Sequence, residues 1–129
     1  MLDVGCGAGR IAVPLTRYLD ATGGYDGLEI DSRHVDWCTR TISSRHRNFR
    51  LVLADIRNTH YNPNGKYEAD TYRFPYETES FNVAFLSSVF THMLPSSLEN
   101  YLSEIARVLR RGGRAFVTYF LLNLSLIHI

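Results

Sequence analysis

The segment Leu2–Arg10, LDVGCGAGR, carries the strongest structural signal in this chain. The residues up to Val4 predict the end of a strand, and a helix is predicted from Arg10 to Leu19. The glycines between them therefore form a strand-to-helix turn. Glycine lets the backbone bend sharply there and brings the free N–H groups of the helix N-terminus close to a ligand. The segment predicts a ligand-binding turn.

Strands and helices alternate along the rest of the chain. Strands are predicted over residues 25–30, 49–53, 81–86 and 114–122, and helices over residues 31–45 and 96–111. Asp31 is predicted to cap the first of these helices, and Ser96 with Glu99 to form a capping box on the second. Residues 57–80 show turn chemistry and no period, which predicts a long irregular excursion.

This alternation predicts the α/β class, with a doubly wound, mostly parallel sheet and helices on both of its faces. The length of 129 residues and the 45% hydrophobic content fit a single domain. In such sheets ligands bind beyond the carboxyl ends of the strands. We therefore expect the site at the residues that directly follow each strand.

Charge and cysteine content argue against several classes of function. Fourteen Lys and Arg residues against 13 Asp and Glu give a net charge of +1, so no nucleic-acid or membrane partner is expected. Cys6 and Cys38 lack the neighbours of a metal site, so reduced thiols and no metal are expected. No apolar stretch is long enough to span a membrane, and no signal peptide is apparent, which predicts a cytoplasmic protein.

The glycines occur at every second position, as Gly5, Gly7 and Gly9, after an acid at Asp3. Dinucleotide-binding turns instead place their third glycine one residue later, where this chain has the bulky Arg10. A nucleotide-linked oxidoreductase is therefore disfavoured, although it remains an alternative.

Four stretches together resemble class I S-adenosylmethionine-dependent methyltransferases: LDVGCGAGR, GLEID (27–31), LADIR (53–57) and ARVLRRGGRAFV (106–117). The resemblance implies a Rossmann-like fold with five strands in the order 3-2-1-4-5, truncated relative to the seven-stranded fold of the family. It also implies that S-adenosyl-L-methionine is the cofactor. Arg111 stands where the family usually has proline, a position that looks structural.

The resemblance assigns cofactor contacts to residues after each of the first four strands. It implies that Glu29 accepts hydrogen bonds from both ribose hydroxyls, that Asp55 accepts one from the adenine amino group, and that Ile56 packs on the ring. The residues at the end of the fourth strand would contact the methionine portion. The full set of predicted cofactor-binding residues is Asp3, Gly5, Cys6, Gly7, Gly9, Glu29, Ile30, Asp55, Ile56, Ser87 and Val89.

The activity implied is methyl transfer to an unidentified acceptor, most simply a small molecule, by in-line displacement. Such a reaction needs alignment more than a covalent nucleophile, so no catalytic side chain is assigned. His92 is the candidate base if the acceptor must lose a proton, but packing near the pocket or helix capping is favoured for it. A module that binds the cofactor without transferring a methyl group is the other alternative.

Both ends of the chain differ from the family pattern. Family members carry a helical segment before the first strand and further elements after the fifth, so we expect residues 1–123 to be a methyltransferase domain that is incomplete at both ends. The last six residues, LSLIHI (124–129), look like a translated sequencing adapter. We expect them to be non-native and exclude them from the functional interpretation.

Overall fold

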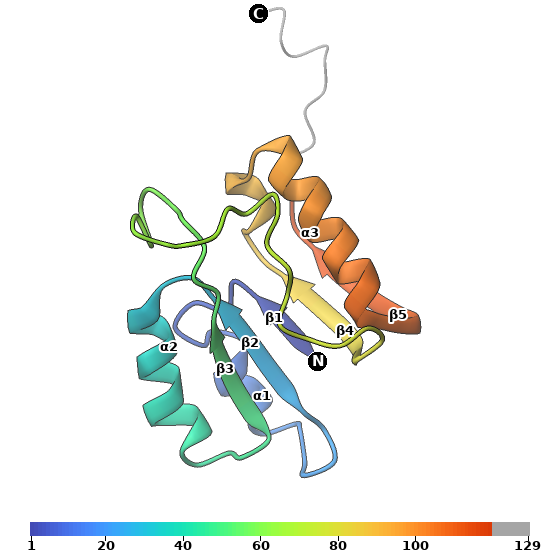
Figure 1. Ribbon diagram of the computed structural model, residues 1–129. Helices are drawn as coiled ribbons and strands as arrows, with labels where there is room; N and C mark the ends of the chain where they lie inside the picture. The colour runs from blue at the N-terminus through green and yellow to red at the C-terminus, as the bar shows by residue number, and fades with distance from the viewer. Residues whose placement is uncertain (120–129) are drawn as a thin grey trace, which may run out of the picture.

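The computed structural model describes residues 1–119 and contains one five-stranded sheet (Figure 1). Its strand order is β3-β2-β1-β4-β5, and all four pairings are parallel. The strands are β1 (Leu2–Val4), β2 (Tyr25–Glu29), β3 (Phe49–Leu53), β4 (Phe81–Leu86) and β5 (Leu109–Val117). The predicted class and strand order are confirmed. The last strand begins at Leu109, five residues before its predicted start, and ends at Val117; positions 120–122 of the predicted strand and the predicted adapter-derived tail lie outside the described residues.

Helices cover both faces of the sheet, as predicted. One face carries α1 (Ala12–Leu15) and α2 (Ser32–Cys38), which continues as the π-helix η1 (Thr39–Ser43). Its buried core contains Tyr25, Phe49 and Ile42. The other face carries α3 (Pro95–Val108), and its larger core includes Leu2, Leu28, Leu86 and Ile105. None of the helices among residues 1–119 is long and apolar enough to cross a membrane.

The excursion, residues 57–80, runs over the same face as α3 (Figure 1). Among its residues the structure contains only isolated bridges, such as Asn58 with Asn62. Phe74 is nevertheless 1% exposed and packs edge-on against Tyr101 of α3, with ring centroids 5.1 Å apart. The prediction of an irregular segment is therefore correct, and the segment contributes to the core.

The register of the parallel strands brings their carboxyl ends together. Val4 at the end of β1 pairs with Leu28 on one side and with Leu86 on the other. Glu29 pairs with Leu53 at the end of β3. The residues that follow β1, β2, β3 and β4 consequently share one edge of the sheet, where a ligand site was expected.

The first two helices differ from their predicted lengths. Regular α-helix in α1 covers four residues, and the chain then tightens into i→i−3 bonds, such as that from the Arg17 amide to Pro14. Asp31 caps α2 as predicted, accepting a bond of 2.9 Å from the Arg33 amide. Further along, the Thr41 hydroxyl donates to the Trp37 carbonyl, a local bond that competes with the helical ladder where α2 changes to η1.

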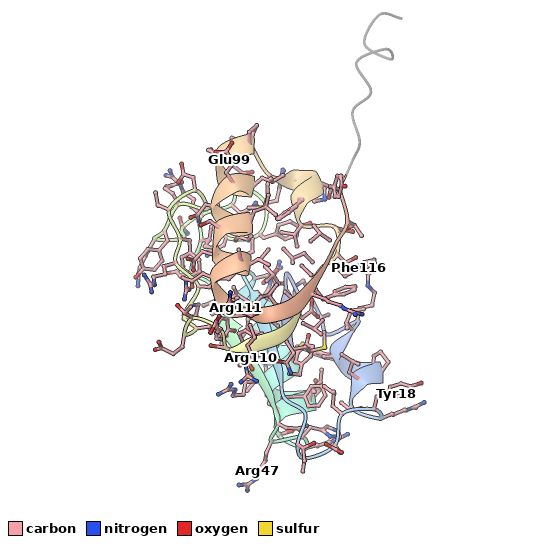
Figure 2. All side chains as sticks on the ribbon, turned by 90° about the vertical axis from the view of Figure 1, so that its right-hand side faces the viewer. Tyr18, Arg47, Glu99, Arg110, Arg111 and Phe116 are labelled. Carbon is pink, nitrogen blue, oxygen red and sulfur yellow. The ribbon has the colours of Figure 1, made fainter. Side chains whose placement is uncertain are left out.

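Helix α3 was predicted wrongly at both ends. It begins at Pro95 with Leu94 as its N-cap, so Ser96 lies inside the helix and the predicted capping box does not form. Proline suits this first position because its φ is already helical and it lacks the N–H that would be unpaired there. At the other end the helix stops at Val108 instead of Arg111. Figure 2 shows Arg110 and Arg111 where α3 meets β5, far from Glu99 near its start.

Candidate functional site

Each glycine of the turn has a positive φ: Gly5 +71°, Gly7 +54° and Gly9 +78°. At Gly5 a Cβ atom would lie 2.5 Å from Val89 Cγ2, and at Gly9 it would lie 2.8 Å from Ile42 Cδ1. Gly5 therefore lets the turn approach the segment after β4, and Gly9 lets it pack on η1. No atom lies within 4 Å of the equivalent point at Gly7.

Glu29 is the acid at the end of β2 and is 7% exposed. Its Oε2 accepts a hydrogen bond of 2.7 Å from the Gly7 amide. Its Oε1 accepts bonds of 2.9 Å from the amides of Ile30 and Asp31. A carboxylate has about four acceptor sites, so roughly one site on Oε2 stays available. The turn and the end of β2 thus fix this carboxylate with one acceptor site to spare.

A cavity of about 540 Å³ lies at this edge of the sheet. Seven of the eleven predicted cofactor-binding residues line it: Gly5, Gly7, Glu29, Ile30, Ile56, Ser87 and Val89. They come from the ends of four different strands, so the topology assembles them. The other four, Asp3, Cys6, Gly9 and Asp55, do not lie on the cavity wall.

Asp3 and Cys6 lie beneath the glycine turn. Asp3 is 2% exposed and accepts a bond of 2.6 Å from the Tyr25 hydroxyl. Burial raises its pKa to about 6, although the Tyr25 bond acts in the opposite direction. Burial also raises the pKa of the Cys6 thiol, and the Sγ atoms of Cys6 and Cys38 both approach the Gly7 carbonyl, at 3.8 and 3.6 Å. These groups support the turn from behind.

Asp55 follows β3 but turns toward the excursion. Its Oδ1 accepts a bond of 3.1 Å from Asn62 Nδ2, and its Oδ2 lies 3.7 Å from Lys66 Nζ. Ile56, the next residue, is 2% exposed and lines the cavity. The chain thus presents an apolar side chain to the cavity at this point while the carboxylate binds the neighbouring turn.

Sequence reasoning did not identify a second group of residues on the wall. The excursion contributes Asp70 and Glu68, and Glu68 is paired with Arg57 at 2.5 Å. Helix α3 contributes Ser97 and Tyr101, whose i, i+4 spacing was the signal that could have revealed them. The remaining members of this group are Val4, Leu28, His34, Ala54, Arg57, Asn58, Tyr61, Ala69, Met93, Leu94 and Ser96.

His92 belongs to a short 3₁₀ helix, η2 (Phe90–His92), and also lines the cavity. Its imidazole makes no hydrogen bond with any residue among 1–119, so it is neither oriented by a partner nor acting as a helix cap. Within that same range, no group of three or more His, Cys, Asp or Glu residues is arranged to hold a metal ion.

Comparison with known proteins identifies the family. Residues 2–117 match the family model described as "Methyltransferase domain". Among curated relatives, a fatty-acid O-methyltransferase of Mycolicibacterium smegmatis is 32% identical over 114 residues, which are 88% of this chain and 34% of the relative. A cobalt-precorrin-6B C(15)-methyltransferase of Thermoplasma acidophilum is 23% identical over 95% of this chain and 55% of its own length.

Solved structures share the fold. Geranyl diphosphate C-methyltransferase of Streptomyces coelicolor, solved with Mg²⁺, geranyl diphosphate and S-adenosyl-L-homocysteine, superposes with a TM-score of 0.65 at 18% identity. The match covers 90% of this chain and 36% of that one. The chain spans between a third and just over half the length of these relatives.

Proposed function

We propose that this chain, which belongs to the methyltransferase domain family, is the cofactor-binding part of an enzyme that transfers a methyl group from S-adenosyl-L-methionine to a small-molecule acceptor. The names of the two relatives, which specify a fatty acid and a cobalt-precorrin, support an acceptor of this class. The S-adenosyl-L-homocysteine bound in the Streptomyces coelicolor structure supports the cofactor.

The observation that carries the proposal is Glu29. Its carboxylate is fixed by three backbone amides and faces the cavity with roughly one acceptor site to spare. A ribose hydroxyl is a donor that fits this site, and the second hydroxyl would replace the Gly7 amide on Oε2. An acid at this place also binds the ribose of dinucleotides, so the preference for a nucleoside without pyrophosphate rests on the glycine spacing of the turn, where Arg10 stands at the position of the third glycine of dinucleotide-binding turns.

The remaining contacts suit the other parts of the same cofactor. Leu28, Ala54 and Ile56 give the cavity an apolar wall on which an adenine ring would pack. Gly5 and Gly7 leave the backbone open to close approach, and Ser87 offers a hydroxyl at the end of β4. Asp55 bonds Asn62 and does not line the cavity, so a contact with the adenine amino group would need a different orientation of its side chain. On the side of the cavity formed by the end of β2, the Glu29 carboxylate suits a cofactor that carries hydrogen-bond donors, whereas Glu68 is already paired with Arg57.

The bound cofactor supplies an electrophilic methyl group on a sulfonium. The protein's contribution is to hold the acceptor in line with that methyl group and to exclude water, which accounts for much of the rate enhancement in such displacements. His92 is the titratable side chain after β4 that would accept a proton from a hydroxyl or amine acceptor.

Isothermal titration tests the cofactor assignment. We expect S-adenosyl-L-methionine to bind and NADH not to bind. Glu29→Ala should weaken binding at least tenfold, because it removes a charge-assisted hydrogen bond. Glu99→Ala is the matched control, since Glu99 is an exposed residue of α3 that does not line the cavity (Figure 2). Tight NADH binding, or an equal effect of the two variants, would contradict the proposal.

A further inference from the structure

The N-terminus of α3 opens onto the cavity without a capping side chain. Leu94, the N-cap residue, cannot accept a hydrogen bond with its side chain, and Pro95 has no N–H. The amides of Ser96 and Ser97 donate to no acceptor within residues 1–119, and both residues line the cavity. Two N–H groups without an acceptor among the described residues therefore lie at the positive end of a fourteen-residue helix, in residues that line the cavity.

Tyr101 is a second, independent feature of the same wall. It is 5% exposed, lies one helical turn after Ser97, and its hydroxyl makes no hydrogen bond with any described residue. Among the described residues, the unpartnered hydroxyls fully enclosed by protein are those of Ser43 and Tyr76. The Tyr101 hydroxyl is therefore not fully enclosed, and the residue lines the cavity.

These groups are all hydrogen-bond donors, and together they match an anionic oxygen. Burial raises the pKa of Tyr101, so the phenol stays protonated and able to donate. Of the carboxylates on the cavity wall, Glu29 is bound by three amides and Glu68 is paired with Arg57. Asp70 is the one whose carboxylate has no partner among residues 1–119.

Apolar side chains lie beside this donor group at the rim. Leu94 is 74% exposed and Tyr61 is 53% exposed, although both are large apolar residues, and Met93 lies next to Leu94 on the same wall. The proposed cofactor contacts come from the ends of β1 to β4, which leaves this part of the cavity to another ligand.

We propose that the first turn of α3 and the Tyr101 hydroxyl form a subsite for the carboxylate of an apolar carboxylic acid, the methyl acceptor. The Ser96 and Ser97 amides and the Tyr101 hydroxyl donate to the carboxylate, while Leu94 and Met93 contact the apolar body. This inference rests on the proposed function in assigning that acid the role of acceptor.

Binding of octanoate and of octanol, each in the presence of S-adenosyl-L-homocysteine, tests the subsite. We expect octanoate to bind more tightly than octanol. Tyr101→Phe keeps the ring contact with Phe74 and should weaken octanoate about tenfold, because a hydrogen bond to a charged group is lost. Tyr76→Phe is the matched control, since it removes an unpartnered hydroxyl that does not line the cavity, and it should leave octanoate binding unchanged.

Ser97→Asp separates a ligand-binding role from a structural one. An aspartate in the first turn favours the helix but repels a carboxylate at the same amides. We expect the melting temperature to hold or rise while octanoate affinity falls more than tenfold. A structural role for Ser97 would instead change both quantities together.

Three outcomes would overturn the subsite. One is equal affinity for octanoate and octanol, and another is unchanged octanoate binding in both cavity variants. The third is that Tyr101→Phe weakens S-adenosyl-L-homocysteine but not 5′-methylthioadenosine, which lacks the amino acid end, since the carboxylate bound would then be the cofactor's. Failure of the unsubstituted chain to bind S-adenosyl-L-homocysteine would count against the proposed function. Octanoate binding could still be measured in the absence of S-adenosyl-L-homocysteine.

Discussion

The glycine turn (residues 5–9) and the excursion (residues 57–80) form facing parts of one cavity but are held in different ways. The conformation of the turn is set by its own glycines, which adopt positive φ angles, and the Gly7 amide donates a hydrogen bond to Glu29. The excursion is held from a distance by α3. Arg107 donates to the carbonyls of Phe74 and Tyr76, and Glu104 accepts from the Phe74 amide.

The two segments therefore illustrate two ways in which a fold can position the wall of a binding cavity. The glycine turn depends on backbone conformations that one residue type permits, so its sequence is restricted and easy to identify. The excursion depends on a few side chains of another element that satisfy backbone groups about 30 positions away. Its own sequence is therefore much less restricted, and removing one distant side chain should disturb it more than most changes within it.

The largest expected effect comes from removing that distant support. Arg107→Leu would leave Glu104 buried without its partner, together with two carbonyl groups of the excursion. Breaking a buried pair in this way costs about 3 kcal/mol or more in the free energy of unfolding. Urea denaturation should show this loss, whereas Arg17→Ala, on an exposed side chain of the other face, should cost less than about 0.5 kcal/mol. Equal effects would mean that α3 does not hold the excursion.

A change in stability of similar size but opposite sign is expected when the charge of Asp3, beneath the glycine turn, is removed. Burial holds the pKa of Asp3 at about 6 in the folded chain, above its ordinary value of 3.8, so the folded state binds the proton more tightly. Stability is therefore lost as the pH rises from about 4 through 6, by about 3 kcal/mol in total.

Asp3→Asn removes this cost because the amide carbonyl can still accept from Tyr25 but carries no charge. The variant should be more stable than the unsubstituted chain at pH 7.5 and about equal to it at pH 4. Thermal unfolding across this pH range measures the difference. A difference that does not change with pH would contradict the raised pKa.

A smaller loss of stability is expected when a side chain is added at Gly9. In Gly9→Ala the new methyl group meets both a positive φ and a Cβ position 2.8 Å from Ile42 Cδ1. Gly112→Ala is a matched control, because Gly112 has nearly the same φ, +77°, and no atom within 4 Å of its Cβ position. We expect about 2 kcal/mol of destabilisation at Gly9 and about 1 kcal/mol at Gly112. Equal losses would show that conformation alone, and not packing on η1, requires glycine.

The smallest effect expected is at Asn100. Its side-chain amide donates to the carbonyls of Ala69 and Tyr72, at 2.9 Å each. Asn100→Ala should cost about 1 to 2 kcal/mol, and Asn64→Ala, at an exposed residue of the excursion, should cost almost nothing. Limited proteolysis should also cut the excursion faster in Asn100→Ala. No change in either measurement would leave Arg107 and Glu104 as the main support.

The sequence alone determined the class of fold, the strand order through a family resemblance, and the positions of Glu29, Ile56 and the glycine turn. These follow from local rules: buried parallel strands are mostly apolar, and a run of sharp turns at positive φ strongly favours glycine. Helix α3 was placed correctly, but its start was wrong because Ser96 and Glu99 fit a capping box as well as Pro95 fits a first helical position.

Only the tertiary structure decided which residues face the cavity. The sequence predicts cofactor contacts for Asp3, Asp55 and Glu29 alike. In the structure, Asp3 is buried against Tyr25 and Asp55 bonds Asn62. The i, i+4 spacing of Ser97 and Tyr101 places them on one face of α3, but only the packing of α3 over the excursion puts that face on the cavity wall. The physical reason is that a motif fixes backbone conformation over a few residues, whereas the partner of a side chain depends on contacts between elements far apart in the chain.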